Sequence, residues 1–268
     1  MFLGQEHNLD STQHQVRNIL QETSKQHWER YCLNIATTPI SFHSMYKPGG
    51  TFMLTVGNAT GQILSQSHDK WGRWVSQTFQ GAEGRTITIV SAYQVVTDNT
   101  KGGTTTVATQ QYSLLTNDQD SMTAPRTAFR RDLKLFLQKC RNRGEELILV
   151  GDLNEAVGED VEGMITIVQG LGLIDMMGAR HQYPLPTTYT RGRCLDYGFA
   201  TPAICMALEA CGFESFGHRF SSDHRAYFFD FDTRKLFGTQ IQQLSKFEPR
   251  LLHSTNAKQV TCYLRRMN

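Results

Sequence analysis

Short apolar segments with the character of β-strands recur along most of the chain. Residues 51–56 and 85–92 are rich in β-branched side chains and are bounded by glycines, which is typical of strands. Residues 71–79 contain two tryptophans, a valine and a phenylalanine and predict a further strand. The continuous apolar run 147–150 suits a strand buried on both faces, and two more apolar strands are expected over 195–200 and 226–231.

Helical patterns lie between these strands. A helix capped by Asp10 or Ser11 is expected to run towards Trp28. A second helix is expected to begin at a proline and end before a glycine over residues 125–143, and a third over 164–171. Because strands and helices interleave, the pattern predicts a layered α/β protein.

Two segments depart from this pattern. Residues 97–124 are rich in Thr, Asn, Asp and Gln and predict a mobile surface excursion with one short helical stretch. Residues 233–268 hold seven Lys or Arg against the single acid Glu248. We therefore expect one body over residues 1–232, followed by a basic C-terminal tail or linker.

Composition narrows the classes of protein. The net charge is +2, which gives no global field that would attract a polyanion, so any polyanion must be held locally. No apolar run is long enough to span a membrane, and the first residues lack the features of a secretory signal. The six cysteines form no C-x-x-C pair. We expect an intracellular protein, nuclear or cytoplasmic, with reduced thiols and no membrane partner.

Charge is segregated along the middle of the chain. Residues 126–143 hold seven Lys or Arg and only the acid Asp132, whereas residues 144–175 hold eight acids and no Lys or Arg. A solvated helix face explains the basic residues better than a nucleic-acid groove does, because an amphipathic helix needs a polar side. For the aromatic pair Trp71 and Trp74, packing is likewise favoured over stacking on bases.

Polar side chains recur where the predicted strands end, which is where an α/β sheet places its ligands. The groups are Gln5-Glu6, Gly151 to Asn154, Asp196 within Leu195-Asp196-Tyr197, and Asp223-His224 within Ser222-Asp223-His224. Asp152 and Asn154 are two residues apart, so both point to the same side if the extended geometry continues. Several carboxylates with one histidine and one asparagine suit a hard cation such as Mg²⁺ better than zinc.

Each of these residues also has a structural interpretation. Asp152 could form a turn, Asp196 could pair with an arginine, and His224 could be a hydrogen-bonded core histidine. Tyr93 could pack at the end of a strand with its hydroxyl at the surface. Taken together, with a histidine that leads into an apolar strand, the groups favour a catalytic site.

The order of these motifs resembles that of the metal-dependent endonuclease/exonuclease/phosphatase superfamily. The matching segments are QE at 5–6, GG at 49–50, SAY at 91–93, GDLN at 151–154, the TY-then-LDY run at 188–197 and SDH at 222–224. The resemblance covers residues 1 to about 232, and the chain looks most similar to the endonuclease domains of non-LTR retrotransposons. It implies a DNase I-like four-layer α-β-β-α sandwich, with two packed mixed β-sheets flanked by helices.

The resemblance implies roles for residues that would meet the metal and the phosphate. Glu6 would be a ligand of Mg²⁺, or of Mn²⁺ in its place. Asp223 would be a second metal or phosphate-side group. Tyr93 would donate its phenol to the phosphate or to the leaving oxygen.

It also implies the residues that act on water and phosphate. Asp152 would orient and deprotonate the attacking water, and Asn154 would hold Asp152 or the scissile phosphate. His224 would contact a non-bridging phosphate oxygen, with Asp196 on its other ring nitrogen. The reaction would be a one-step hydrolysis with the water in line with the departing oxygen.

The chain departs from the family pattern at two places. The family has an Asn on a strand before the QE motif, and this sequence starts after that point, so the first strand is expected to be missing. Gln94-Val95 follows Tyr93 where the family often has x-Pro.

Three functions follow from these observations. The first is Mg²⁺-dependent hydrolysis of phosphodiester bonds by a DNA-nicking endonuclease, with DNA as the partner. The second is a phosphatase or phosphodiesterase for a small phosphate ester, such as an inositol phosphate or a phospholipid head group. The third is a non-catalytic remnant that binds nucleic acid or protein.

Overall fold

The largest sheet among the residues that the structure describes has six strands. The computed structural model describes residues 1–40, 46–96, 106–120, 123–156, 158–181, 185–188, 192–217 and 222–238. The strand order is β4-β5-β6-β7-β9-β8. The bounds are β4 Ile63–His68, β5 Trp74–Gln80, β6 Thr86–Tyr93, β7 Glu146–Asp152, β8 Ile174–Asp175 and β9 Asp196–Ala200. Only β6 and β7 are parallel among these neighbours, so the sheet is mixed.

Two smaller sheets are antiparallel throughout. One has the order β1-β3-β2 and the other pairs β10 with β11. Their bounds are β1 Phe2–Gln5, β2 Tyr31–Ala36, β3 Thr51–Val56, β10 Leu208–Phe213 and β11 Tyr227–Phe231. Within the described ranges, β1 is paired only with β3 and β11 only with β10. In place of the expected second mixed sheet, the described residues thus form two antiparallel sheets.

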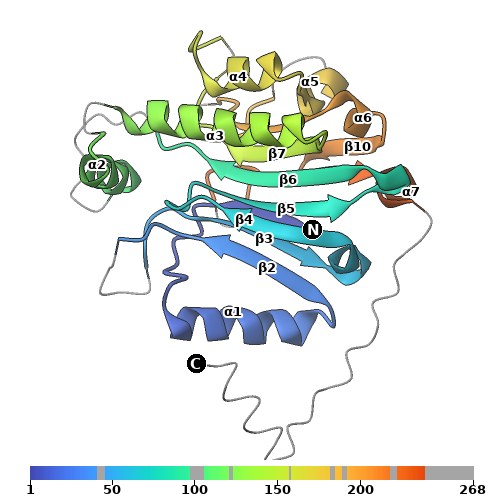
Figure 1. Ribbon diagram of the computed structural model, residues 1–268, viewed down its shortest axis with the longest axis horizontal. Coiled ribbons are helices and arrows are strands. Elements are labelled where there is room, and N and C mark those ends of the chain that lie inside the picture. The colour runs from blue at the N-terminus through green and yellow to red at the C-terminus, as the bar shows by residue number, and fades with distance from the viewer. Residues whose placement is uncertain are drawn as a thin grey trace, which may run out of the picture.

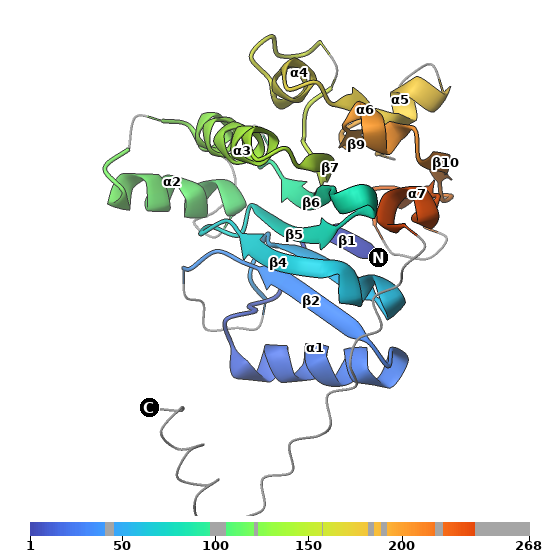
Figure 2. The same ribbon diagram turned by 45° about the vertical axis from the view of Figure 1, so that its right-hand side comes forward.

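The small sheets and the helices α3 (Pro125–Asn142) and α4 (Met164–Gly170) pack on opposite faces of the six-stranded sheet (Figures 1 and 2). In β7, Ile148 and Val150 join an apolar cluster with residues of β1, β3 and β11. Their neighbours Leu147 and Leu149 join the cluster that contains Phe129 and other residues of α3. The apolar run 147–150 is thus buried on both faces, as predicted. With α1 on the outer side of β2, the layers form the expected α-β-β-α sandwich (Figure 1).

Seven α-helices and two 3₁₀ turns are present in the described part of the chain. They are α1 His14–His27, α2 Val107–Asn117, α3 Pro125–Asn142, α4 Met164–Gly170, α5 Met176–His181, α6 Pro202–Cys205 and α7 Thr233–Phe237, with η1 Gly57–Gln62 and η2 Ala82–Gly84. The predicted helices over 125–143 and 164–171 are confirmed to within one residue at their ends.

The expected cap of the first helix is wrong. α1 begins at His14, and the residue before it makes no side-chain capping bond. The Asp10 carboxylate is buried and instead lies 2.9 Å from the Lys47 ammonium, which is itself fully buried. A buried ammonium needs a counter-charge, and this long-range need outweighs the local preference for a cap.

The strand predictions are confirmed in part. Residues 71–73 form a turn before β5, and Arg73 there is buried with its guanidinium 4.4 Å from the Trp71 ring centroid and 5.0 Å from that of Trp74. The packing interpretation of these tryptophans is therefore confirmed. The strands β2, β4 and β10 were not predicted. β4 reads Ile-Leu-Ser-Gln-Ser-His and is largely exposed at the sheet edge, so it lacks the apolar run of an interior strand.

The polar excursion and the C-terminal stretch are described only in part. Residues 97–105 and 121–122 lie outside the described residues, but α2 between them packs beside α3 with Leu115 buried. At the other end, Leu236 of α7 is buried and the Phe237 ring lies 6.0 Å from that of Phe79. Residues 233–237 therefore pack on the body, and residues 239–268 are not described.

None of the described helices combines the length and the apolar character needed to cross a bilayer. The five described cysteines, Cys32, Cys140, Cys194, Cys205 and Cys211, are free thiols.

Candidate active site

The register of three neighbouring strands places three polar side chains in one row. Tyr93 of β6 is opposite Asp152 of β7, and Asp152 is opposite Asp196 of β9. Side chains of directly opposed residues point to the same face of a sheet. That face carries Ile148 and Val150 further along β7, so the row lies on the side of the small sheets. Strand pairing alone therefore brings together residues that are about a hundred positions apart.

Asn154 fixes the Asp152 carboxylate. The backbone N–H of Asn154 donates to Asp152 Oδ1 at 3.0 Å, and its side-chain Nδ2 donates to Asp152 Oδ2 at 3.0 Å. Asn154 has φ 46°, in the left-handed region, where asparagine is better tolerated than other non-glycine residues. The expected same-side placement of the two residues is thus achieved by a turn and not by continued strand geometry.

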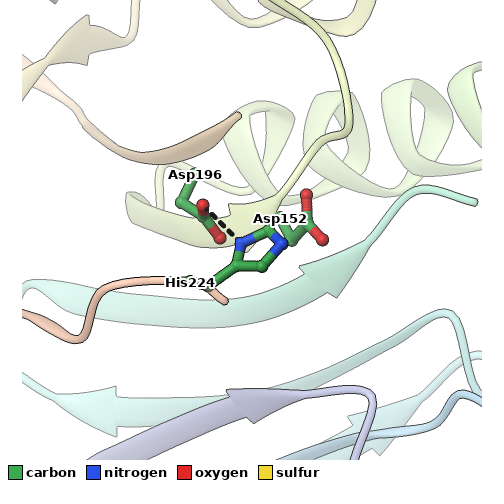
Figure 3. Close-up of side chains that lie close together, drawn as sticks. All are labelled: Asp152, Asp196 and His224. Carbon is green, nitrogen blue, oxygen red and sulfur yellow. Dashed lines mark hydrogen bonds and ion pairs between the residues drawn. The ribbon is translucent and has the colours of Figure 1, made fainter. Parts of the chain in front are cut away.

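His224 pairs with Asp196. His224 Nδ1 lies 2.8 Å from Asp196 Oδ2, and Figure 3 shows the imidazole between the carboxyl groups of Asp196 and Asp152. One potential ligand atom from each of these three residues lies within 4.8 Å of the others. The hydrogen bond to Asp196 raises the pKa of His224 to about 9, against the opposing effect of burial. The imidazole is therefore protonated at neutral pH.

Burial disfavours the charged form of Asp152. Loss of solvent, followed by the neighbouring charge of Asp196, raises the pKa of Asp152 well above its usual value, while the charge of His224 lowers it. A carboxyl group with a raised pKa is a better proton acceptor once ionised.

Glu6 reaches the site through Tyr93. The phenol of Tyr93 donates to Glu6 Oε1 at 2.6 Å, and the tyrosine is 3% exposed while Glu6 is exposed. Burial and the charge of Glu6 raise the pKa of Tyr93 well above its usual value, so the phenol stays protonated. Gln5 before it donates to Ser91 Oγ at 2.9 Å, which ties β1 to β6.

The glycine pair explains the shape of the turn that carries Glu6. Glu6 and Asn8 both have positive φ, at 50° and 57°. Asn8 exchanges backbone and side-chain hydrogen bonds with Gly49. A Cβ on Gly50, whose φ is 87°, would lie 2.3 Å from His7 Nε2. The GG segment is therefore needed for the close approach of the turn after β1.

Asp223 and Glu6 lie outside the three-residue group of potential ligands among the described residues. Asp223 is exposed, and its charge contributes to the raised pKa of His224. The residues that the resemblance assigns to the metal are thus at the margin of the cluster, while Asp152, Asp196 and His224 form its centre.

The donor set of the cluster fits a hard divalent cation. Asp152 and Asp196 of the cluster, with Glu6 at its margin, offer carboxylate oxygens, which Mg²⁺ and Mn²⁺ prefer. Burial, and after it repulsion by the carboxylates of Asp196 and Glu6, raises the pKa of Asp152 above its usual value. A cation bound beside them would relieve that repulsion.

Sequence reasoning missed the residues that support the site. Thr187 is buried, and its Oγ1 accepts the backbone N–H of Asp196 at 3.2 Å, while its carbonyl accepts the N–H of Arg225 at 2.8 Å. It therefore connects the strand of Asp196 to the segment of His224. Gln94 and Glu155 hold the turn after β7. In the sequence, Glu155 is marked only by its position directly after the GDLN segment and by the basic residues 126–143 that precede that segment.

Comparison with known proteins identifies the fold. No protein-family model matches the sequence, and neither does any curated protein. The 3′ phosphatase NExo from Neisseria, bound to a product DNA hairpin, is 16% identical with a TM-score of 0.58, over 86% of this chain and 88% of that chain. The AP endonuclease LMAP from Leishmania major is 14% identical with a TM-score of 0.60, over 84% and 76%. An AP endonuclease from Archaeoglobus fulgidus is 14% identical with a TM-score of 0.55, over 86% and 88%.

At these identities the likeness shows the fold. The chain has a DNase I-like fold, and its structural neighbours are proteins of the endonuclease/exonuclease/phosphatase group.

Proposed function

We propose that this protein is a divalent-metal-dependent phosphodiesterase that nicks DNA. The observation that carries the proposal is the group of Asp152, Asp196 and His224, whose potential ligand atoms lie within 4.8 Å of one another at one end of a DNase I-like sandwich. The named activities of the structural neighbours are those of AP endonucleases and a 3′ phosphatase, all of which hydrolyse phosphate esters.

Different residues would bind the metal ion and activate the water. Glu6 and Asp223, beside the central carboxylates, would hold Mg²⁺ or Mn²⁺, and the ion would neutralise charge that develops on the phosphate. Asp152, oriented by Asn154, accepts one proton from the attacking water. The water oxygen bonds to phosphorus, the bond to the departing oxygen breaks, and that oxygen takes a proton from solvent.

Fixed donors stabilise the phosphate during this step. Protonated His224 donates from Nε2 to a non-bridging oxygen, because Asp196 occupies Nδ1. The phenol of Tyr93 would turn its single hydrogen from Glu6 Oε1 to the phosphate or to the departing oxygen once Glu6 holds the ion. Such preorganised donors act where charge develops.

Within this group we propose a finer placement among the endonuclease domains of non-LTR retrotransposons, which rests on the general texture of the sequence. That placement favours internal nicking of duplex DNA over removal of nucleotides from an end. Supercoiled plasmid should accordingly become open circles before any shortening of linear DNA is detected.

The test is Mg²⁺-dependent relaxation of supercoiled plasmid by the full chain. Asp152→Asn and His224→Ala should each lower the rate by about 10²- to 10⁴-fold, because each removes a positioned acid or base. His14→Ala, an exposed histidine at the start of α1, is the matched control and should keep the wild-type rate.

Two results would overturn the proposal. Turnover of inositol phosphates or phospholipid head groups without plasmid nicking would indicate a small-ester phosphatase. Saturable DNA binding without Mg²⁺- or Mn²⁺-dependent product would indicate a non-catalytic binding module.

A further inference from the structure

A buried polar cluster lies under the turn that carries Asn154, and the hydrolysis described above does not use it. It consists of Gln94 directly after β6, Glu155 directly after Asn154, and Arg130 on α3. Gln94 is 0% exposed and Glu155 is 1% exposed. A buried glutamine and a buried glutamate are costly unless their polar atoms are hydrogen-bonded.

Gln94 contacts three consecutive residues of the turn. Its backbone N–H donates to the carbonyl of Asp152 at 2.9 Å. Its side-chain Nε2 donates to the carbonyl of Leu153. Its own carbonyl accepts from Asn154 Nδ2 at 2.9 Å. The amide of Asn154 is therefore held between Gln94 on one side and the Asp152 carboxylate on the other.

Arg130 and Glu155 complete the cluster. Arg130 donates from Nε to Gln94 Oε1 at 3.2 Å and from a terminal guanidinium nitrogen to Glu155 Oε2 at 2.8 Å. Glu155 also accepts the backbone N–H groups of Met164 and Ile165, at 3.1 and 3.3 Å, at the start of α4. One carboxylate thus joins α3, α4 and the turn.

The turn needs such support because Asn154 has φ 46°. A non-glycine residue stays in the left-handed region only when its surroundings fix it there. Its two backbone neighbours in the sequence, Leu153 and Glu155, are both held by the cluster. Removing one member would take hydrogen bonds away from its buried partners, and the turn could relax.

We propose that Gln94 and Glu155 are positioning residues for Asn154 and, through it, for the Asp152 carboxylate. The catalytic part of this inference rests on the proposed hydrolysis. The geometric part, that the cluster holds the turn, stands on the hydrogen bonds alone.

The variant Gln94→Met tests the proposal, because it keeps the length of the side chain and removes its hydrogen bonds. We expect kcat for plasmid nicking to fall about 10- to 100-fold with KM changed less than about twofold, since misplacing a reacting group has effects of this size. Gln77→Met is the matched control. Gln77 is also 0% exposed and hydrogen-bonded on the same sheet, with its side chain bonded to Thr55, so it should lose stability without loss of kcat.

A double-mutant cycle separates positioning from a general structural effect. If Gln94 acts through Asn154, Gln94→Met should reduce kcat much less in an Asn154→Ala background than in the wild type. Equal reductions in both backgrounds would overturn the proposal, as would a wild-type kcat in Gln94→Met itself.

Amide hydrogen exchange gives a readout that does not need activity. In Gln94→Met and Glu155→Gln, exchange at Asn154 should be at least about tenfold faster than in the wild type, with no change over residues 147–150 of β7. Unchanged exchange at Asn154 would overturn the positioning role whether or not the protein hydrolyses DNA. A wild type that hydrolyses nothing would refute only the proposed function, and exchange would still decide the role of Gln94.

Discussion

Individual side chains in the cluster take their protonation from their immediate neighbours. Asp196 bonds to the imidazole of His224 and raises its pKa to about 9, and the charge of the same carboxylate contributes to the raised pKa of Asp152. Tyr93 keeps its proton because it is buried beside Glu6. The strand register of Tyr93, Asp152 and Asp196, together with His224 from the segment before β11, therefore places a neutral donor, a proton acceptor and a cationic donor side by side.

The His224–Asp196 pair predicts how stability depends on pH without a divalent ion. The pKa of His224 rises from 6.5 to about 9 on folding, so the folded state holds the proton more tightly. The hydrogen bond between charged His224 and Asp196 contributes about 1.5–3 kcal/mol to the free energy of unfolding. This contribution is complete below pH 6.5 and declines as the pH rises towards 9.

Urea unfolding of the wild type and of His224→Gln in EDTA checks this. The stability difference between the two proteins should shrink between pH 6.5 and 9. A difference that stays constant or grows over that range would contradict the assignment of a charged imidazole.

The first turn of α4 is capped by a residue that lies outside the helix. α4 begins after Gly163, which supplies no side-chain cap, and the buried Glu155 carboxylate caps the helix from the preceding loop. A Cβ on Gly163 would lie 1.9 Å from Glu155 Oε1, although the φ of Gly163 is an ordinary −69°. The glycine is needed for space and not for backbone freedom.

Two alanine substitutions in this helix should therefore have opposite effects. Gly163→Ala should destabilise the protein by about 1–3 kcal/mol, because the methyl group collides with Glu155. Gly170→Ala, at the last residue of α4 with open space around its Cβ position, should stabilise it by about 0.5–1 kcal/mol. Denaturant midpoints measure both, and a destabilising Gly170→Ala would show that backbone freedom matters in this helix.

Elements with strong local signals were predicted well, and elements without them were missed. α3 lies between Pro125 and Gly144, and its apolar positions at helical spacing are buried against the sheet. β4, by contrast, is polar and lies at a sheet edge, so pairing with β5 determines its conformation. A strand whose conformation depends on pairing with its neighbour cannot be predicted from its own residues.

At the scale of the molecule, charges that are separated in the sequence meet again in space. Among the bases of residues 126–143, Arg126, Arg130, Arg131, Arg141 and Arg143 each lie within ion-pair distance of a carboxylate. Most of these partners come from the acidic stretch 144–175. The basic face of α3 is therefore largely neutralised, which agrees with a helix face and not with a nucleic-acid groove.

Because carboxylates neutralise most arginines of α3, the main excess of basic residues lies in the C-terminal residues 239–268. The whole chain carries +2, and the five bases and one acid of residues 239–268 carry +4, so residues 1–238 carry −2. We expect removal of residues 239–268 to flatten the dependence of DNA affinity on salt by about one to four units of log K per log[salt], because fewer counterions are released.

Fluorescence anisotropy at several salt concentrations measures that slope. The full chain with its five bases in 239–268 replaced by Gln is the control and should give the same flattening. An unchanged slope in both proteins would show that this stretch does not contact DNA.

The sequence by itself determined the features that depend on residues adjacent along the chain. Apolar periodicity and glycines at turns predicted a layered α/β protein and the bounds of α3, while the family resemblance carried by the polar segments implied the α-β-β-α sandwich and its site residues. These are local properties, because propensity and turn chemistry act over a few positions.

Tertiary structure decided which distant residues meet. The register that aligns Tyr93, Asp152 and Asp196, and the burial of Gln94 beneath Asn154, follow from strand pairing and packing across long stretches of chain. The pKa shifts and the hydrogen bonds of the site depend on those contacts, since desolvation and charge act through space and not along the backbone.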